Sequence, residues 1–203
     1  MKRHYFLVMI PVVVMVLSSA GCGTTKVTRM EPEKIVDISG RWNDTDARMI
    51  AEEVIGDCLS ASWISEFNKV QGRDPVVIVG TILNRTHEHI NTDVFVEDLE
   101  RALINSHKVK FVSSKGEREE VREEREDQQL GNTNPATVTV KGMETGASFM
   151  LKGTINDVKD ETKGKYVVLY QVNLELVDMK TNEKVWLGQK KIKKLVERPR
   201  ASL

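Results

Sequence analysis

The sequence predicts an α/β protein of the α+β type, in which a small mixed sheet carries helices mainly on one face and ends in an antiparallel three-strand meander. Three observations lead to this fold class. Apolar residues recur at helical spacing after residue 46, a run of β-branched residues follows, and the last third of the chain alternates apolar with polar residues. The chain shows no repeat and suits one domain, residues 38–203.

The first element is an amphipathic helix that we expect to extend to about Phe67. Its apolar positions recur at three- and four-residue steps: Ala47, Ile50, Val54, Cys58 and Ala61. Asp44 or Thr45 can cap its first amides, and Asp46 suits the positive end of the helix. Because Cys58 falls in the apolar pattern, we expect a small buried core residue and not a reactive thiol.

Residues 76–82 form a continuous β-branched run, which predicts a central strand covered on both faces. A second helix is expected over residues 93–106, where apolar residues gather on one face, and a short strand over residues 109–112. These elements place helices and strands in alternation through the first half of the domain.

A charged segment follows the short strand. Ser114 and Glu117 fit a capping box, but the stretch up to Gln129 has little to bury, so it is either a solvated helix or a mobile flap. Residues 137–145 are ambiguous, because their apolar positions alternate like a strand and also step like a helix.

Three strands are expected to complete the fold, over residues 149–158, 166–179 and 184–194. The middle strand alternates from Tyr166 to Leu176, which predicts one buried and one wet face. The lysines that begin at Lys190 are typical of a solvated sheet edge that resists pairing with other strands.

The amino terminus has the layout of an export signal, in which two basic residues precede a short apolar run and small residues precede Cys22. We therefore expect residues 1–21 to be a cleavable signal segment, Cys22 to be the lipid-bearing first residue of the mature protein, and residues 22–37 to be a lipidated tether. The alternative is a secreted protein with an ordinary cleavage site and an incidental cysteine.

Composition and motifs indicate no catalytic, metal or cofactor site. The chain has 30 basic and 30 acidic residues, and this balance gives no reason to expect a nucleic-acid partner. His87, Glu88 and His89 lack the helical spacing that aims two imidazoles at one ion, so they are expected as solvent-facing loop residues. An envelope hydrolase would need a convergent polar site that the sequence does not show.

Arg41 and Trp42 are the candidate partner-binding residues. Tryptophan and arginine are enriched among interface hot spots, and this pair stands in a connecting segment before the first helix. Trp42 could instead fold back over that helix and close the core. Both interpretations remain open from the sequence.

Several motifs together resemble the penicillin-binding protein activator LpoB family. They are the cysteine with its short tether, the stretch Gly40-Arg41-Trp42-Asn43-Asp44-Thr45-Asp46, the strand end Gly80-x-Ile82-x-Asn84, and Gly146-Ala147-x-x-Met150-Leu151-x-Gly153. The resemblance implies an outer-membrane lipoprotein facing the periplasm, with a domain similar to the N-terminal domain of TolB. It also implies a non-catalytic regulator that binds and activates a bifunctional penicillin-binding protein, a peptidoglycan synthase. It favours the helical interpretation of residues 137–145.

A second hypothesis is an envelope secretion or assembly lipoprotein similar to the CsgG family. That role requires ring oligomers and long amphipathic strands able to line a barrel. The strand that begins at Tyr166 is the one candidate, because no equally alternating partner of similar length is visible in the sequence. A monomer is therefore expected.

Overall fold

The computed structural model describes residues 25–197, and the chain divides into two units between Lys34 and Ile35. Residues 25–34 are exposed and irregular, with one turn in which the Lys34 amide donates to the Glu31 carbonyl at 3.1 Å. The predicted signal segment and Cys22 lie outside the described residues. Within residues 25–197, every helix is too short or too polar to cross a membrane.

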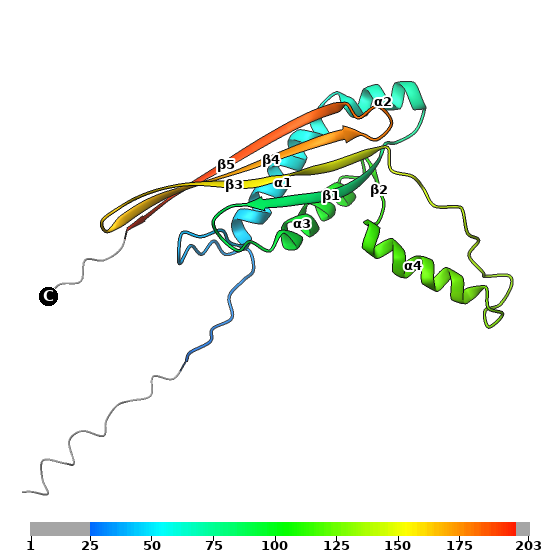
Figure 1. Ribbon diagram of the computed structural model, residues 1–203, viewed down its shortest axis with the longest axis horizontal. Helices are drawn as coiled ribbons and strands as arrows, with labels where there is room; N and C mark the ends of the chain where they lie inside the picture. The colour runs from blue at the N-terminus through cyan, green and yellow to red at the C-terminus, as the bar shows by residue number, and fades with distance from the viewer. Residues whose placement is uncertain (1–24, 198–203) are drawn as a thin grey trace, which may run out of the picture. The chain divides into compact units, whose positions relative to one another are not determined.

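The strands found in residues 25–197 form one mixed sheet (Figure 1). They are β1 (Val76–Arg85), β2 (Lys110–Phe111), β3 (Phe149–Thr162), β4 (Lys165–Asp178) and β5 (Lys184–Glu197). Their spatial order is β2-β1-β3-β4-β5. Strand β1 pairs parallel with β2 and β3, whereas β3, β4 and β5 pair antiparallel. The predicted mixed sheet with a terminal antiparallel meander is confirmed.

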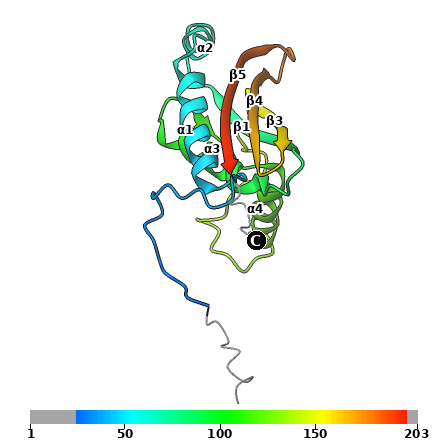
Figure 2. The ribbon, with the colours of Figure 1, turned by 90° about the vertical axis from the view of Figure 1, so that its left-hand side faces the viewer.

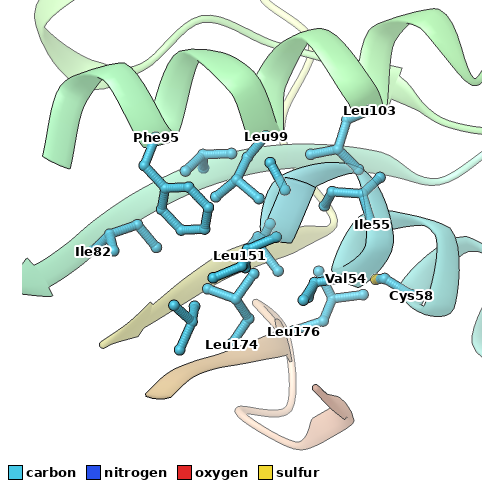
Figure 3. Close-up of a cluster of buried hydrophobic side chains, with 14 of the residues drawn as sticks. Val54, Ile55, Cys58, Ile82, Phe95, Leu99, Leu103, Leu151, Leu174 and Leu176 are labelled. Carbon is cyan, nitrogen blue, oxygen red and sulfur yellow. The ribbon is translucent and has the colours of Figure 1, made fainter. Parts of the chain in front are cut away.

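Two helices, α1 (Asp44–Ser60) and α3 (Thr92–Asn105), pack against each other and cover the same face of the sheet (Figure 2). Their apolar side chains meet those of β1, β3 and β4 in a single core (Figure 3). The labelled members are Val54, Ile55, Cys58, Ile82, Phe95, Leu99, Leu103, Leu151, Leu174 and Leu176. Helices on one face are therefore confirmed, and burial of these side chains supplies the main stabilising free energy.

Burial of Cys58 agrees with its position in the apolar pattern. The residue is 1% exposed, and burial raises the pKa of its thiol to about 12. A thiol with so high a pKa stays protonated and unreactive at neutral pH. The predicted core role is confirmed.

Strand β1 is covered on both faces near its start, as predicted. Val77 and Val79 belong to the core under the helices, while Val76 and Ile78 point to the other face and are 1% and 6% exposed. The strand lies between β2 and β3, so its central position is also confirmed.

The first predicted helix is in fact two helices, α1 and α2 (Trp63–Gln71). The chain leaves helical geometry at Ala61, whose φ and ψ are −72° and 158°. This break turns the Trp63 side chain into the core, where it is 4% exposed and its Nε1 donates to the Cys58 carbonyl at 2.7 Å. Burial of a large aromatic ring thus outweighs the continuous helical pattern that the sequence suggests.

Asn43, and not Asp44 or Thr45, caps α1. Its side chain accepts from the Asp46 amide at 3.0 Å, and the Asp46 carboxylate accepts from the Asn43 amide at 3.0 Å. This reciprocal capping box satisfies two backbone amides that otherwise have no partner in the helix. The helix therefore begins at Asp44, one residue earlier than a cap at Asp44 would allow.

The charged segment forms α4 (Lys115–Gln128), which begins with the predicted capping box of Ser114 and Glu117 and buries no residue. It stands apart from the sheet (Figure 1). Residues 137–145 form turns and irregular loop and no helix, so the helical interpretation favoured by the resemblance is wrong. Their ordering comes from α4, because Glu144 binds Arg122 and Arg125, each at 2.7 Å.

Strands β3, β4 and β5 are each 14 residues long, and their far ends extend past the helices (Figure 1). Strands β3 and β5 are longer than predicted, whereas β4 has the predicted length. Strand β5 alternates half-buried and exposed residues from Val185 to Glu197. The expectation that β4 lacks an alternating partner of similar length is therefore wrong. Lysines in β5 weaken its apolar pattern, and this hid the strand's full length from sequence reasoning.

Candidate functional site

The segment that precedes α1, residues 36–43, lies against the far ends of β4 and β5, and we call it the strap. The Tyr166 hydroxyl donates to the Ser39 carbonyl at 2.8 Å, and the Lys194 ammonium donates to the Arg41 carbonyl at 3.1 Å. Lys194 also pairs with Asp37 at 2.7 Å. These contacts join residues more than 120 positions apart in the chain, so only the folded sheet positions the strap.

Gly40 lets the strap approach β5 closely. Its φ of +69° lies in the left-handed region, and a Cβ atom at this position would collide with the Val196 side chain. Glycine meets both requirements at no steric cost. The glycine before Arg41 and Trp42 therefore sets the path on which these two residues are presented.

Lys194 also forms a buried ion pair with Asp46 at the start of α1, at 2.6 Å. The two side chains are 10% and 7% exposed. Burial alone would lower the pKa of Lys194, but its hydrogen bonds to Asp37 and Asp46 outweigh burial and leave that pKa above its ordinary value. Burial raises the pKa of Asp46 more than its hydrogen bond to Lys194 lowers it. The pair fixes the strap, α1 and β5 to one another.

Trp42 folds back against the core, and Arg41 beside it is exposed. The indole ring meets Phe95 and Tyr170 edge-on, with centroids 6.1 and 5.6 Å away. It nevertheless remains partly exposed and lines a surface cleft. The structure thus supports core closure by Trp42 and still leaves this residue partly exposed.

Glu88 was expected to be a solvent-facing loop residue, but its side chain is partly buried and joins two distant segments by hydrogen bonds. Its Oε1 accepts from the Tyr170 hydroxyl at 2.8 Å, and its Oε2 accepts from the Trp42 amide at 3.2 Å. Burial, together with the hydrogen bond to this carboxylate, raises the pKa of the Tyr170 hydroxyl, which therefore stays protonated and donates. Through Glu88 the loop after β1 holds Trp42 in place.

His87 and His89 are exposed, as predicted, but His87 has a partner. Its Nδ1 lies 2.8 Å from Oδ1 of Asp157, and its amide donates to the same carboxylate at 3.2 Å. The imidazole is 84% exposed and the carboxylate only 3% exposed. The pair orders the loop, because the buried carboxylate is satisfied by hydrogen bonds from the loop backbone and ring.

These elements enclose a cleft of about 630 Å³ between the strap, the loop after β1 and the far ends of β3 and β4. Its lining includes Arg41, Trp42, Asp44, His87, Glu88, His89, Asp157, Lys159, Tyr166 and Val168. The lining combines aromatic and aliphatic side chains with charged groups, a composition that suits an inserted side chain of a protein partner.

The candidate metal ligands do not converge on one point within residues 25–197. Among these residues there is no group of three or more histidine, cysteine, aspartate or glutamate side chains that could hold a metal ion. Carboxylates of the cleft that accept hydrogen bonds from Trp42, Tyr170 and His87 serve to position the loop and the strap.

Sequence reasoning found Arg41 and Trp42 but missed Glu88, Asp157 and Lys194. Their importance depends on contacts between residues 46 to 148 positions apart. One signal was available for Lys194, because it occupies a position of β5 whose alternation faces the helices. A lysine in that register requires a carboxylate partner on the covering element.

The sequence matches the model of a family described as peptidoglycan-synthase activator LpoB over residues 46–192. Among solved structures, the chain is similar to the LpoB C-terminal domain from Salmonella enterica, with 19% identity, a TM-score of 0.40, and coverage of 72% of this chain and 98% of that one. The NMR structure of E. coli LpoB shows 16% identity, a TM-score of 0.41, and coverage of 89% and 87%. Lipoprotein GNA1162 from Neisseria meningitidis shows 18% identity, a TM-score of 0.40, and coverage of 63% and 88%. No curated protein matches the sequence.

Proposed function

Because the chain belongs to the peptidoglycan-synthase activator LpoB family, whose model it matches over residues 46–192, we propose that it is a lipid-anchored, non-catalytic regulator that binds and activates a periplasmic penicillin-binding protein. In this role Cys22 carries the lipid in the outer membrane, the residues between Cys22 and the strap form the tether, and the domain faces the periplasm. The partner is a bifunctional synthase that polymerises and cross-links glycan strands.

The cleft supports a binding role and provides the contact surface. Arg41, which is exposed, and Trp42, which is partly exposed, both line the cleft, and Arg41 forms no ion pair with any side chain of residues 25–197. Both residues are held in place through their backbone atoms. The Lys194 ammonium donates to the carbonyl of Arg41, and the Glu88 carboxylate accepts from the amide of Trp42. These two contacts leave the side chains of Arg41 and Trp42 available to a partner. Pre-organised aromatic and arginine side chains of this kind bind partners at low entropic cost.

The decisive experiment measures binding of the purified lipoprotein to the cognate synthase, together with the rate of glycan polymerisation. We expect binding and a faster rate. Arg41→Ala should weaken binding about tenfold, while the matched control Arg73→Ala, an exposed arginine on a different surface, should not change it. No binding at about 50 μM would refute the proposal, since useful regulatory contacts are tighter than that.

A second variant tests whether synthase binding depends on the hydrogen bonds that hold Trp42 in position. Glu88→Gln retains one acceptor oxygen, but its amide group must face one of the two donors that Glu88 now satisfies. We expect weaker synthase binding and a shifted amide resonance of Trp42, with little loss of helix content. Unchanged binding would show that the partner does not use the cleft.

The CsgG-like alternative is favoured by one observation, the equal 14-residue lengths of β3, β4 and β5 with alternating exposure along β5. A secretion or assembly subunit would form a large closed ring. Light scattering of the lipoprotein in detergent distinguishes the two roles. A ring of many subunits supports the alternative, and a monomer or dimer supports the activator.

A further inference from the structure

The edge of β1 that faces β2 is open over most of its length. Strand β2 pairs with β1 only at Val76 and Val77, whereas β1 continues to Arg85. The Val112 amide donates to the Val77 carbonyl at 3.2 Å, and the chain then turns away at Ser114 to begin α4. Along the part that β2 does not reach, β1 is therefore the outermost strand of the sheet (Figure 1).

The backbone of Val79 points to this open edge. Alternate residues of a strand direct their amide and carbonyl groups to the same side. The Val76 carbonyl accepts from the Ser148 amide on the β3 side, and the Val77 carbonyl accepts from Val112 on the β2 side, so Val79 faces the β2 side as well. Within residues 25–197, Val112 makes the last backbone hydrogen bond to this edge. The Val79 amide and carbonyl are thus groups to which another strand can pair.

A groove of about 680 Å³ runs along the open edge. It is lined by five consecutive β1 residues, 78–82, by one face of α3 and by the first turn of α4. Consecutive strand residues point to opposite faces of a sheet, so a groove lined by all five includes the strand edge itself. Its lining residues all differ from those of the cleft that holds Arg41 and Trp42. The groove is a separate surface, roughly 17 Å long at the usual rise of a strand.

The α3 side of the groove is acidic. Asp93, Glu97 and Glu100 lie on one face of the helix, because residues three and four apart fall one above the other. Within residues 25–197 these three carboxylates form no ion pair, and like charges at this spacing destabilise a helix. Burial, followed by the charges of Glu117 and Glu97, raises the pKa of Glu100. A cation bound in the groove relieves this repulsion.

The other side of the groove is apolar, and α4 bounds it. Ile78 of β1 pairs with Met150 of β3, and both alternate with core residues, so their side chains lie on the sheet face opposite α3. The first turn of α4 contributes Lys115 and Arg118, two cations against four carboxylates in the lining. The buried Nε of Arg118 has no hydrogen-bond partner among residues 25–197, and a peptide carbonyl in the groove is an acceptor for it.

We propose that the open edge of β1 binds an extended segment of a partner protein in which basic and apolar residues alternate. The segment adds one strand to the sheet and pairs its backbone with Val79. Because strand side chains alternate between two faces, one row meets the carboxylates of α3 and the other meets Ile78 and Met150. Charge complementarity selects basic residues for the first row, and burial of aliphatic groups selects apolar residues for the second. Since α3 and α4 both line the groove, a single strand fits it better than the edge of a second sheet.

The experiment titrates the purified full chain with a blocked octapeptide of alternating lysine and valine. Fluorescence anisotropy of a labelled peptide measures binding, and NMR hydrogen exchange of the Val79 amide locates the site. We expect a dissociation constant of about 100 μM or lower. Exchange at Val79 should become about tenfold slower in the complex, because this amide gains an acceptor.

Altered peptides separate backbone pairing from charge. N-methylation removes an amide donor and keeps the charge, and alternate amides of a strand face the same edge. Of two peptides methylated either at every lysine or at every valine, one should therefore bind about tenfold more weakly and the other should bind normally. A peptide with glutamate in place of lysine should not bind, because its charges meet those of α3.

Variants of the chain test the acidic side and keep this proposal separate from the proposed function. Glu97→Gln should weaken peptide binding about threefold, since it removes one exposed charge. The matched control is Glu66→Gln on α2, an exposed carboxylate on another surface, which should not change binding. Arg41→Ala, expected to weaken synthase binding, should bind the peptide normally, so either proposal can fail while the other holds.

Three outcomes overturn the proposal. The first is no binding at about 1 mM peptide. The second is equal affinity of the two methylated peptides, which would mean that the backbone does not pair with an edge. The third is protection of the Val79 amide that grows with protein concentration in the absence of peptide, which would show that a second copy of this chain occupies the edge.

Discussion

Helices α1 and α4 begin in the same way and end in different environments. Each opens with a capping box, Asn43 with Asp46 in α1 and Ser114 with Glu117 in α4. Nine residues of α1 are buried, whereas none of α4 is. Capping therefore determines where each helix starts, and burial determines how much each contributes to the stability of the domain.

The largest expected effect is the difference in unfolding free energy between a substitution in the buried helix α1 and one in the exposed helix α4. Ile50→Ala in α1 should lower the free energy of unfolding by about 4 kcal/mol, because Ile50 is 1% exposed and the change leaves a cavity. Val121→Ala in α4, a residue 45% exposed, should change it by less than about 0.5 kcal/mol. Urea unfolding of both variants measures the difference, and equal losses would contradict the comparison.

The next largest effect is the loss of stability when the buried ion pair between Lys194 and Asp46, at the start of α1, is broken. Lys194→Met should cost about 3 kcal/mol, because it leaves the Asp46 carboxylate buried without its cation at the start of α1. Lys191→Met on the same strand is the control, since Lys191 is exposed and forms no ion pair within residues 25–197. Thermal unfolding should show a clear decrease in Tm for the first variant only. A Tm equal to that of the control would show that the pair is dispensable.

A smaller effect compares the caps directly. Asn43→Ala should destabilise the protein by about 1 kcal/mol, because α1 is part of the cooperative core. Ser114→Ala should fray the first turn of α4 with little change in global unfolding. Amide hydrogen exchange measures the local effect and chemical unfolding measures the global one. If both variants lose the same global stability, α4 is more strongly coupled to the core than its exposure indicates.

The smallest expected effect is local and depends on pH. Hydrogen bonds from Arg122 and Arg125 hold the pKa of Glu144 at about 2, below its ordinary value of 4.5. Since the folded pKa is depressed, the attachment of residues 139–144 to α4 is stabilised above pH 4.5 and is lost as pH falls through about 2. Carboxyl NMR titration follows the group, and the Thr139 amide, which donates to Gln128, reports the attachment. Arg122→Gln should shift the transition to higher pH, and an unshifted curve would exclude this ion pair as the cause.

The elements of the fold were largely predictable because they depend on local periodicity. The run from Val76, the alternation from Tyr166 to Leu176 and the capping box at Ser114 all predict structures that form as expected. Two predictions failed at positions where a distant contact outweighs the local pattern. Trp63 enters the core and breaks the first helix, and Glu144 binds α4 in a segment that forms neither helix nor strand.

The candidate site was predictable only in part. Arg41 and Trp42 were recognisable by residue type, because indole and guanidinium groups suit interfaces wherever they are exposed. Glu88 looked like one member of a polar loop, since its two hydrogen-bond partners, Trp42 and Tyr170, are 46 and 82 residues away. A hydrogen bond over such a separation leaves no periodic trace in the sequence.

By itself, the sequence determined the order of helices and strands, the side of each that meets the core, and the family to which the chain belongs. Only the tertiary structure decided that the strap lies on β5, that Glu88 supports Trp42, and that one face of the far hairpin stays uncovered. The physical reason is the range of the interactions. Periodic burial is encoded in neighbouring residues, whereas hydrogen bonds and ion pairs between distant segments exist only once the chain has folded.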